Sequence, residues 1–239
     1  MKISVIIPAY NEEKSLSKTL GAILAQDYPD FEVILVDNAS TDGTLEVARS
    51  FPAVKALVEK NKGTMWACER GRKEATGEIV VRMDADCLPP KDWLVRGGAH
   101  FRNQKVSAVT GPYDYFDAKP FFRHFSLYFQ KYIYRLTNWI TQLLGIGAVM
   151  IGGNSFMRGS ALEAVGGFNT SFIFYGDDTN TAKNMAMKGW VVLDPNLIMP
   201  TSARRFEKEG FLKIHMKYLS GFLKVLFSST KKSIPRMDV

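Results

Sequence analysis

Two carboxylates follow an apolar stretch of the chain with one residue between them. Asp84 and Asp86 come directly after the run from Glu78 to Met83. Residues two apart at the end of a strand point to the same side, so both carboxylates can address one ligand. Mg²⁺ or Mn²⁺ takes one or two protein carboxylates and completes its shell with phosphate oxygens, so the pair suits a metal-bound diphosphate. A solvated turn at a strand exit is the alternative interpretation.

A third carboxylate stands in the same context. Asp37 ends the apolar run from Glu32 to Val36 and opens a polar segment that continues to Gly43. An aspartate there can accept a hydrogen bond from a nucleobase N–H or a ribose hydroxyl. Asp42 is placed to cap the helix that follows, and capping is also the alternative role for Asp37.

Three short β-branched runs must position these residues. They extend from Ile3 to Ile7, from Glu32 to Val36 and from Glu78 to Met83, with helix-like segments between them. This alternation predicts a parallel α/β sheet. Ligands of open parallel sheets bind beyond the carboxyl ends of the strands, so the polar clusters that end the three runs should face one crevice.

The pattern changes after about residue 115. Apolar residues recur at helical spacing from Phe121 to Leu143 and predict one long, aromatic-rich amphipathic helix. A short strand from Ala148 to Met157 and a helix from Thr179 to Lys188 should follow. An apolar stripe from Phe211 to Val225 then lies opposite three lysines, Lys213, Lys217 and Lys224. Since neither a repeat nor a linker interrupts the chain, we expect one domain with two halves.

Composition and charge narrow the class of protein. The chain has 239 residues, of which 46% are hydrophobic and 12% aromatic, which excludes a disordered protein. Two cysteines exclude a disulfide scaffold and favour a reduced compartment. The net charge is +7, and the segment from Ala203 onward supplies most of it, with nine Lys or Arg and three Asp or Glu. A basic amphipathic tail suits an anionic membrane surface, whereas the lack of a recognisable binding module argues against nucleic acid.

The sequence also bears on location. The apolar run after Met1 is too short for a signal peptide, so export is not expected. The uncharged stretch from Leu136 to Met157 contains four glycines and several polar residues, which makes it a poor membrane span. We therefore expect a cytoplasmic protein, with the inner face of a membrane as the alternative to free solution.

Seven short motifs occur in an order that resembles glycosyltransferase family 2, whose members invert the sugar and have the GT-A fold. The motifs are SVIIPAYNEE, VDNASTDGT, NKG, EATGEIVVRMDAD, GGNSF, EAVGGFN and YGDD, from about Ile3 to Phe206. The resemblance implies a Rossmann-like nucleotide-binding sheet with helices on both faces. It also implies a single glycosyltransferase domain over 1–239: a nucleotide-sugar-binding half to about 115, an acceptor and catalytic half over about 116–206, and the basic tail over 207–239.

The resemblance further implies roles for individual residues. The donor is a nucleotide-diphosphate sugar, and Asp37 reads its base. Asp84 lies at the ribose or the metal, and Asp86 binds the Mg²⁺ or Mn²⁺ that bridges the diphosphate. Asp178 is the general base. The loop that borders the nucleotide comprises Pro8, Ala9, Tyr10 and Glu12.

This chemistry is physically consistent. A metal-bound diphosphate leaves readily because the cation neutralises the charge that develops on it. A carboxylate such as Asp178 takes the proton of the attacking hydroxyl, and one displacement inverts the sugar carbon. Asp177, next to the base, suits the first turn of a helix, or an acceptor contact.

Basic residues that follow Asp178 in the chain could contact phosphate. Arg204 and Arg205 could bind a diphosphate or a phosphate of the acceptor, with a solvated basic turn as the alternative. His215 is a candidate metal contact, with a surface histidine as the alternative.

One departure from the family leaves the nucleotide open. Many members have Ala-Arg-Asn where this chain has Ala67-Cys68-Glu69, and that arginine approaches a uracil. Lys62 or Arg70 could substitute, or the donor could carry GDP or dTDP. Cys68 itself is expected to be a packing residue.

Two other functions remain as alternatives. One is a nucleotidyltransferase, which would carry a basic glycine-rich loop near its N-terminus, where this chain has PAYNEE. The other is a non-catalytic module that binds a membrane surface with the same fold. For a transferase, the expected acceptor is a hydroxyl of a glycan or of a lipid-linked sugar.

Overall fold

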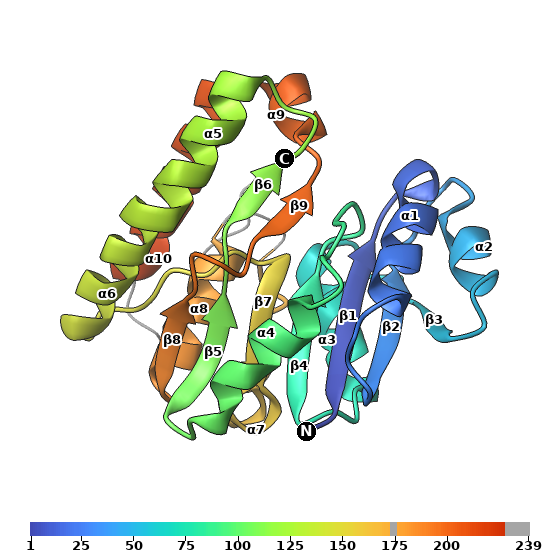
Figure 1. The fold of residues 1–239 in the computed structure, drawn as a ribbon, viewed down its shortest axis with the longest axis horizontal. Helices are drawn as coiled ribbons and strands as arrows, with labels where there is room; N and C mark the ends of the chain where they lie inside the picture. The colour runs from blue at the N-terminus through green and yellow to red at the C-terminus, as the bar shows by residue number, and fades with distance from the viewer. Residues whose placement is uncertain (173–175, 228–239) are drawn as a thin grey trace.

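The structure is a computed structural model that describes residues 1–172 and 176–227, apart from the side chains of residues 207–209, 211, 212 and 215 (Figure 1). Within these residues, a seven-stranded sheet forms the centre, with the strand order β3-β2-β1-β4-β7-β5-β8. The strands are β1 (Ile3–Ala9), β2 (Phe31–Asp37), β3 (Val54–Val58), β4 (Ile79–Met83), β5 (Val106–Thr110), β7 (Asn154–Arg158) and β8 (Trp190–Leu193).

Strand direction divides the sheet. The first four strands in the chain run parallel to one another. Three of them, β1, β2 and β4, are the parallel strands that the sequence predicts. Strand β7 is antiparallel to both of its neighbours, β4 and β5, and β8 pairs with β5 in parallel. A second, two-stranded parallel sheet joins β6 (Tyr113–Tyr115) to β9 (Met199–Thr201). The strands that precede residue 115 therefore pair with strands that follow it, and the expected division into halves stays a prediction.

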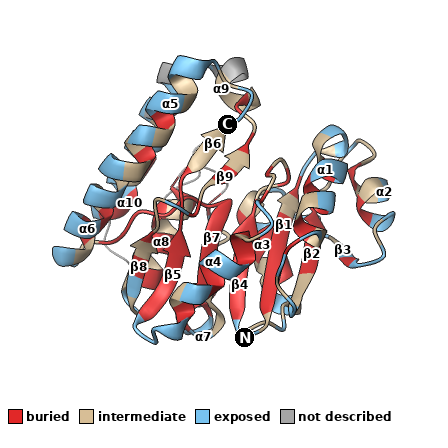
Figure 2. Cartoon of the chain, viewed as in Figure 1, coloured by how far each residue is buried: buried red, intermediate tan, exposed pale blue. Residues whose placement is uncertain are grey.

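Helices cover both faces of the sheet because alternate strand residues are apolar toward each side. On one face, Ile3, Val5 and Ile7 of β1 pack with α1 (Glu13–Leu24), α2 (Thr44–Arg49) and α4 (Trp93–Ala99). On the other face, Ile6 belongs to a core formed with α3 (Thr64–Glu74), α7 (Gly159–Ala164), α8 (Asp177–Ala186) and α10 (Phe211–Phe227). The predicted α/β class is confirmed, and the strands form the buried centre (Figure 2).

Three further helical segments complete the described part of the chain. A 3₁₀ turn (His100–Arg102) follows α4, and α9 (Arg204–Glu209) precedes α10. The long helix predicted from Phe121 to Leu143 is confirmed as one rod, here called the α5–α6 rod, of α5 (Pro120–Phe129), a π-helical turn (Gln130–Tyr134) and α6 (Arg135–Leu143). No helix within the described ranges is long and apolar enough to cross a membrane.

The structure differs from the sequence prediction at three elements. Strand β3 was missed because it is an edge strand in which only Val54 is buried. The strand expected from Ala148 begins at Asn154, because Gly152 and Gly153 form a turn before it. Helix α8 begins at Asp177, two residues earlier than predicted, so both aspartates of the acidic pair lie in its first turn.

The apolar stripe predicted on the last helix is partly an internal surface. Ile214 is 0% exposed and Val225 is 2% exposed. Both lie on α10, which packs on α8. These two positions are therefore not available to a bilayer, contrary to the sequence prediction. The predicted tail residues Lys231, Lys232 and Arg236 lie outside the described residues.

Close packing at α4 generates a stability prediction. A Cβ on Gly97 would lie 2.3 Å from the ring of Phe156, so Gly97→Ala should lower the free energy of unfolding by about 1–3 kcal/mol. Gly21 in α1 has no atom within 4 Å of that position, and Gly21→Ala should raise stability by about 0.5–1 kcal/mol. Urea denaturation of both variants measures the difference. Equal effects would contradict this packing.

Candidate active site

Asp37 lies at the carboxyl edge of the sheet, where β2 ends beside β1. Its backbone pairs with Ala9, and its side chain is 4% exposed. Oδ2 accepts a hydrogen bond of 3.3 Å from the Ser40 N–H, whereas Oδ1 is buried and has no partner among the described residues. A buried oxygen without a donor is unfavourable, so Asp37 is poised to accept a hydrogen bond from a ligand.

The loop after β1 is fixed to the loop after β2. Asn11 accepts a hydrogen bond of 2.8 Å from the Thr41 N–H, and its own N–H donates to Ser40 Oγ at 3.0 Å. Asn11 has a φ of 54°, in the left-handed region that asparagine tolerates better than most residues. Pro8 and Ala9 end β1, and the half-exposed Tyr10 follows them.

A third loop completes this region. Asn38 accepts a hydrogen bond of 2.8 Å from the Gly63 N–H and donates to the Asn61 carbonyl at 2.7 Å, which fixes the Asn61-Lys62-Gly63 segment. Lys62 Nζ lies 5.9 Å from the centroid of the Tyr10 ring. Arg70 instead forms an ion pair of 3.0 Å with Glu74 on α3. Of the two basic residues expected to be candidates for base recognition, Lys62 contacts the loop after β1 and Arg70 is paired on α3.

Cys68 has the packing role that the sequence predicts. It is 0% exposed and belongs to the core on the α3 side of the sheet.

The Asp-x-Asp pair follows β4 and is held by hydroxyl groups. Tyr113 donates to Asp84 Oδ2 at 2.7 Å, and Thr201 donates to Asp86 Oδ1 at 3.2 Å. Burial, and then the charge of Asp84, raises the pKa of Asp86 to about 6. A buried carboxylate beside another carboxylate requires a nearby cation to stay ionised at neutral pH.

Arg204 is the cation that meets this requirement in the structure. It lies at the start of α9, with its Nη2 3.2 Å from Asp86 Oδ2. It also forms an ion pair with Glu12 of the loop after β1. Arg205 points elsewhere, with Nη1 3.5 Å from the Tyr218 hydroxyl on α10. The structure thus brings Glu12, Asp86 and Arg204 together but not Arg205. The His215 side chain and Tyr175 lie outside the described residues.

The carboxylates that follow β4 have the chemistry of ligands for a divalent metal. Within the described ranges, no group of three or more His, Cys, Asp and Glu gathers as a ligand set. Mg²⁺ and Mn²⁺ bound to a substrate diphosphate need only one or two protein carboxylates. Asp84 and Asp86 supply hard oxygen ligands, and the guanidinium of Arg204 against Asp86 marks a position that attracts positive charge. These residues fit such a metal.

Arg82 joins the Asp-x-Asp pair to the acidic pair of α8. Nη1 donates to Asp178 Oδ1 at 2.7 Å and to Asp177 Oδ2 at 3.0 Å, and Nη2 lies 3.8 Å from Asp84 Oδ1. The Arg82 side chain is 8% exposed, and its Nε has no partner among the described residues. Sequence reasoning missed this residue. A charged residue inside an apolar strand was the available signal, because buried arginines are almost always paired.

Asp178 has the environment of a base. Oδ2 accepts a hydrogen bond of 3.1 Å from the Gly152 N–H. Burial, followed by the charge of Asp177, raises the pKa of Asp178 to about 8, while Arg82 acts in the opposite direction. A carboxyl group that titrates near neutral pH can both take and release a proton under ordinary conditions.

The GGNSF motif permits these contacts. A Cβ on Gly152 would lie 2.2 Å from Asp178 Oδ1, and a Cβ on Gly153 would lie 2.2 Å from Asp84 Cγ. Only glycine allows the backbone to approach both carboxylates so closely.

The chain is similar to known proteins in sequence and in structure. The model of Glycosyl transferase family 2 matches residues 4–166. Glycosyltransferase AglE of Haloferax volcanii is 39% identical over 116 residues, which cover 46% of this chain and 38% of AglE. The undecaprenyl-phosphate 4-deoxy-4-formamido-L-arabinose transferase of Aeromonas hydrophila is 37% identical over 103 residues, which cover 39% of this chain and 32% of that protein. The chain therefore spans well under half the length of these curated relatives.

A solved structure is similar over most of the chain. It is the mannosyltransferase PcManGT from Pyrobaculum calidifontis in complex with GDP-Man and Mn²⁺. The TM-score is 0.72 with 27% identity, and the match covers 94% of this chain and 62% of that one.

Removing the buried cation should destabilise the protein in a pH-dependent way. Arg82→Met leaves Asp177 and Asp178 without a counter-charge and should cost about 3–5 kcal/mol near pH 9. The pKa of Asp178 is about 8 in the wild type and should rise further without the guanidinium. The loss should therefore be smaller near pH 7, where Asp178 already holds its proton in both folded proteins. Urea denaturation at both pH values measures this. Arg70→Met, which breaks an exposed pair with Glu74, is the control and should cost about 0.5 kcal/mol. A loss that does not change with pH would contradict the ion-pair network.

Proposed function

The chain belongs to glycosyl transferase family 2, and on that premise we propose that it transfers a sugar from a nucleotide-diphosphate donor to a hydroxyl of an acceptor. The observation that carries this proposal is the network around Arg82. It brings the Asp-x-Asp pair and the candidate base Asp178 to the same end of the sheet as the nucleotide loops. The reaction requires the leaving diphosphate and the attacking hydroxyl to lie on opposite sides of one sugar carbon. In the proposal, the Asp-x-Asp pair serves the diphosphate and Asp178 serves the hydroxyl.

In this proposal, the donor binds across the three loops at the sheet edge. Asp37 accepts a hydrogen bond from the base or the ribose through Oδ1, and Tyr10 borders the nucleotide. Asp84 and Asp86 would hold Mg²⁺ or Mn²⁺, which when bound neutralises charge on the leaving diphosphate. The Mn²⁺ and GDP-Man in the PcManGT structure support this choice of ligands.

Arg204 would change its partner when the donor binds. Its side chain is 42% exposed and contacts Asp86 and Glu12 from a helix terminus. An arginine can bind phosphate oxygens in bidentate fashion. We therefore assign Arg204 to the diphosphate and regard its contact with Asp86 as the arrangement before the donor and metal bind.

Asp178 would act as the general base in a single displacement. Its carboxylate takes the proton of the acceptor hydroxyl while that oxygen attacks the sugar carbon, and the bond to the diphosphate breaks on the opposite side. One base and no protein nucleophile give inversion at that carbon. Asp177 shares Arg82 with Asp178 and helps set its pKa, so its part is positioning.

Thermal-shift measurements with UDP, GDP, dTDP and CDP, each with and without Mn²⁺ or Mg²⁺, test the donor site. A ligand at 100 times its Kd should stabilise the fold by about 2.7 kcal/mol. Asp86→Ala should abolish the metal-dependent part of the shift for the preferred nucleotide. Asp30→Ala is the control. Asp30 is exposed and lies just before β2, at the opposite end of the strands, so this variant should keep the metal-dependent shift. A metal-dependent shift that survives Asp86→Ala would show that the metal binds at other residues.

Turnover tests the base. Asp178→Asn should lower the release of nucleoside diphosphate from the donor about 10²–10⁴-fold, while nucleotide binding is retained. In the wild-type protein, the rate should rise with pH and level off above about 8, because the carboxyl of Asp178 must lose its proton to act. If Asp177→Asn abolishes transfer and Asp178→Asn does not, the assignment of the base is wrong.

A further inference from the structure

The α5–α6 rod has its polar side buried and its apolar side exposed. Its buried residues are polar, with exposed fractions between 5% and 9%: Ser126, Gln130, Asn138 and Thr141. Its outer row is apolar, with exposed fractions between 49% and 66%: Phe125, Tyr128, Tyr132, Leu136, Trp139 and Leu143. This order is the reverse of what a helix on the surface of a water-soluble domain normally shows.

Hydrogen bonds on the inner side fix the orientation of the rod. Gln130 accepts from the Tyr113 N–H at 2.9 Å and donates to the Tyr113 carbonyl at 3.1 Å. One turn from the other end, Asn138 donates to the Val191 carbonyl at 2.8 Å and accepts from the Val149 N–H at 2.9 Å. Rotating the rod to bury its apolar side would break both amide pairs, so the outward direction of the row is built into the fold.

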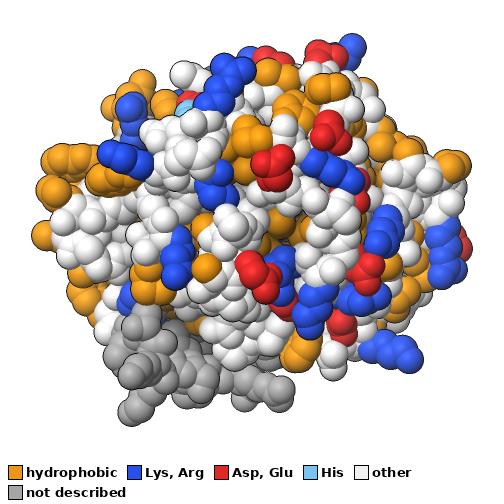
Figure 3. Space-filling view, turned by 90° about the horizontal axis from the view of Figure 1, so that it is seen from below, with side chains coloured by type: hydrophobic (Ala, Val, Ile, Leu, Met, Phe, Trp, Pro, Cys, Tyr) orange, Lys and Arg blue, Asp and Glu red, His pale blue; other side chains and the backbone are white. Residues whose placement is uncertain are grey.

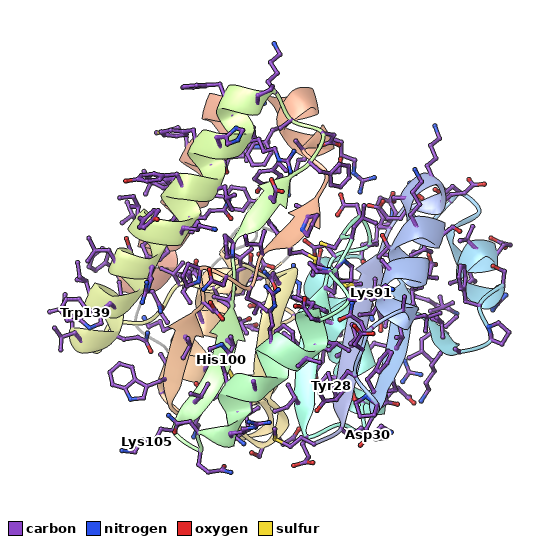
Figure 4. The ribbon with its side chains drawn as sticks, viewed as in Figure 1. Tyr28, Asp30, Lys91, His100, Lys105 and Trp139 are labelled. Atoms are coloured by element: carbon purple, nitrogen blue, oxygen red, sulfur yellow. The ribbon has the colours of Figure 1, made fainter. Side chains whose placement is uncertain are left out.

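The outer row is long and continuous. Its members are separated by three, four, four, three and four residues, which keeps them on one side of the rod. From Phe125 to Leu143 the row extends about 27 Å at 1.5 Å per residue. Figure 2 shows the exposed outer side, and Figure 4 shows Trp139 pointing away from the sheet. Continuous apolar surface of this kind marks an interaction site.

Helix α10 adds a second exposed row on the same flank of the molecule (Figure 1). The Phe206 ring just before it lies 5.4 Å from that of Phe122 at the start of the rod. At the other end, a Cβ on Gly147, just beyond α6, would lie 3.1 Å from Leu226 of α10. The two helices therefore run alongside each other. Among the described side chains of α10, this row comprises Met216, Leu219, Leu223 and Phe227, and Tyr218 is also exposed.

The charge of the two helices indicates an anionic partner. No Asp or Glu occurs between Asp117 and Glu163, a segment that contains the whole rod, and none occurs within α10. The basic residues of the two helices and the residue before α5 are Lys119, Arg123, Lys131, Arg135, Lys213, Lys217 and Lys224. Elsewhere acidic and basic side chains alternate, as the face seen from below shows, while apolar side chains gather at its left edge (Figure 3).

We propose that the outer row of the α5–α6 rod, together with the exposed row of α10, docks on an anionic lipid bilayer, with both helices lying in the interface. Basic helices without acidic residues are attracted to anionic lipids, and rings such as those of Tyr128, Tyr132 and Trp139 suit the headgroup region. A second copy of the chain would place basic surface against basic surface, so charge favours the bilayer.

The docking surface adjoins the candidate active site. Phe122 of the rod contacts Phe206 of α9, and α9 begins at Arg204, which contacts Asp86. Docking would therefore bring the candidate active site close to the membrane. This position favours a lipid-linked acceptor, an inference that rests on the proposed function.

Flotation of the full chain with lipid vesicles tests the proposal. Vesicles of phosphatidylcholine alone are compared with vesicles that contain about 30% phosphatidylglycerol. Binding should need the anionic lipid and should weaken at about 0.5 M NaCl, where screening is strong. The Leu136→Gln/Trp139→Gln variant should lower the partition coefficient at least about tenfold. Val58→Gln/Val95→Gln changes two exposed apolar residues on other elements and is the matched control, which should bind like the wild type.

Two results would overturn the docking surface. One is equal partition of the wild type and the Leu136→Gln/Trp139→Gln variant. The other is a wild-type dimer in light scattering that this variant converts to monomers, which would make the row an interface between copies. The nucleotide thermal shift, measured on the same samples, separates this proposal from the proposed function: vesicle binding without any nucleotide response would retain the surface and reject the transferase.

Discussion

The site depends on one buried guanidinium. Arg82 projects from the central strand β4 and holds Asp177 and Asp178 while lying near Asp84. Charges removed from water are tolerated only when they are paired closely, so β4, the Gly152-Gly153 turn and the first turn of α8 must all be in register. The segments that this ion pair joins are nearly a hundred residues apart in the chain.

Two arginines share the negative charge of the site, and their surroundings differ. Arg82 is fixed inside the sheet, whereas Arg204 approaches Asp86 from the start of a short helix and is 42% exposed. The fixed arginine keeps the acidic pair in place before any ligand arrives. The half-exposed guanidinium of Arg204 is accessible to a phosphate, whereas the buried carboxylate of Asp86 needs another cation if Arg204 leaves it.

The chain uses hydrogen bonds where a surface helix usually uses apolar packing. In the α5–α6 rod, the amide side chains of Gln130 and Asn138 attach the helix to the backbone of neighbouring segments. This frees the aromatic and aliphatic residues to face outward. The aromatic contact between Phe122 and Phe206 connects this outward surface to the helix that carries Arg204.

The local pattern of the sequence determined many of the secondary-structure elements of this protein. Periodicity and β-branched runs predicted the parallel strands, the long helix and the acidic residues at the strand ends, because these signals arise within a few neighbouring residues. Tertiary structure alone decided which groups meet. Arg82 looked like an isolated charge, and Arg204 and Arg205 looked equivalent, until the fold turned one toward Asp86 and the other toward Tyr218. It also decided the exposed side of the rod, because helical periodicity defines two faces and only the partners of Gln130 and Asn138 determine which one is buried.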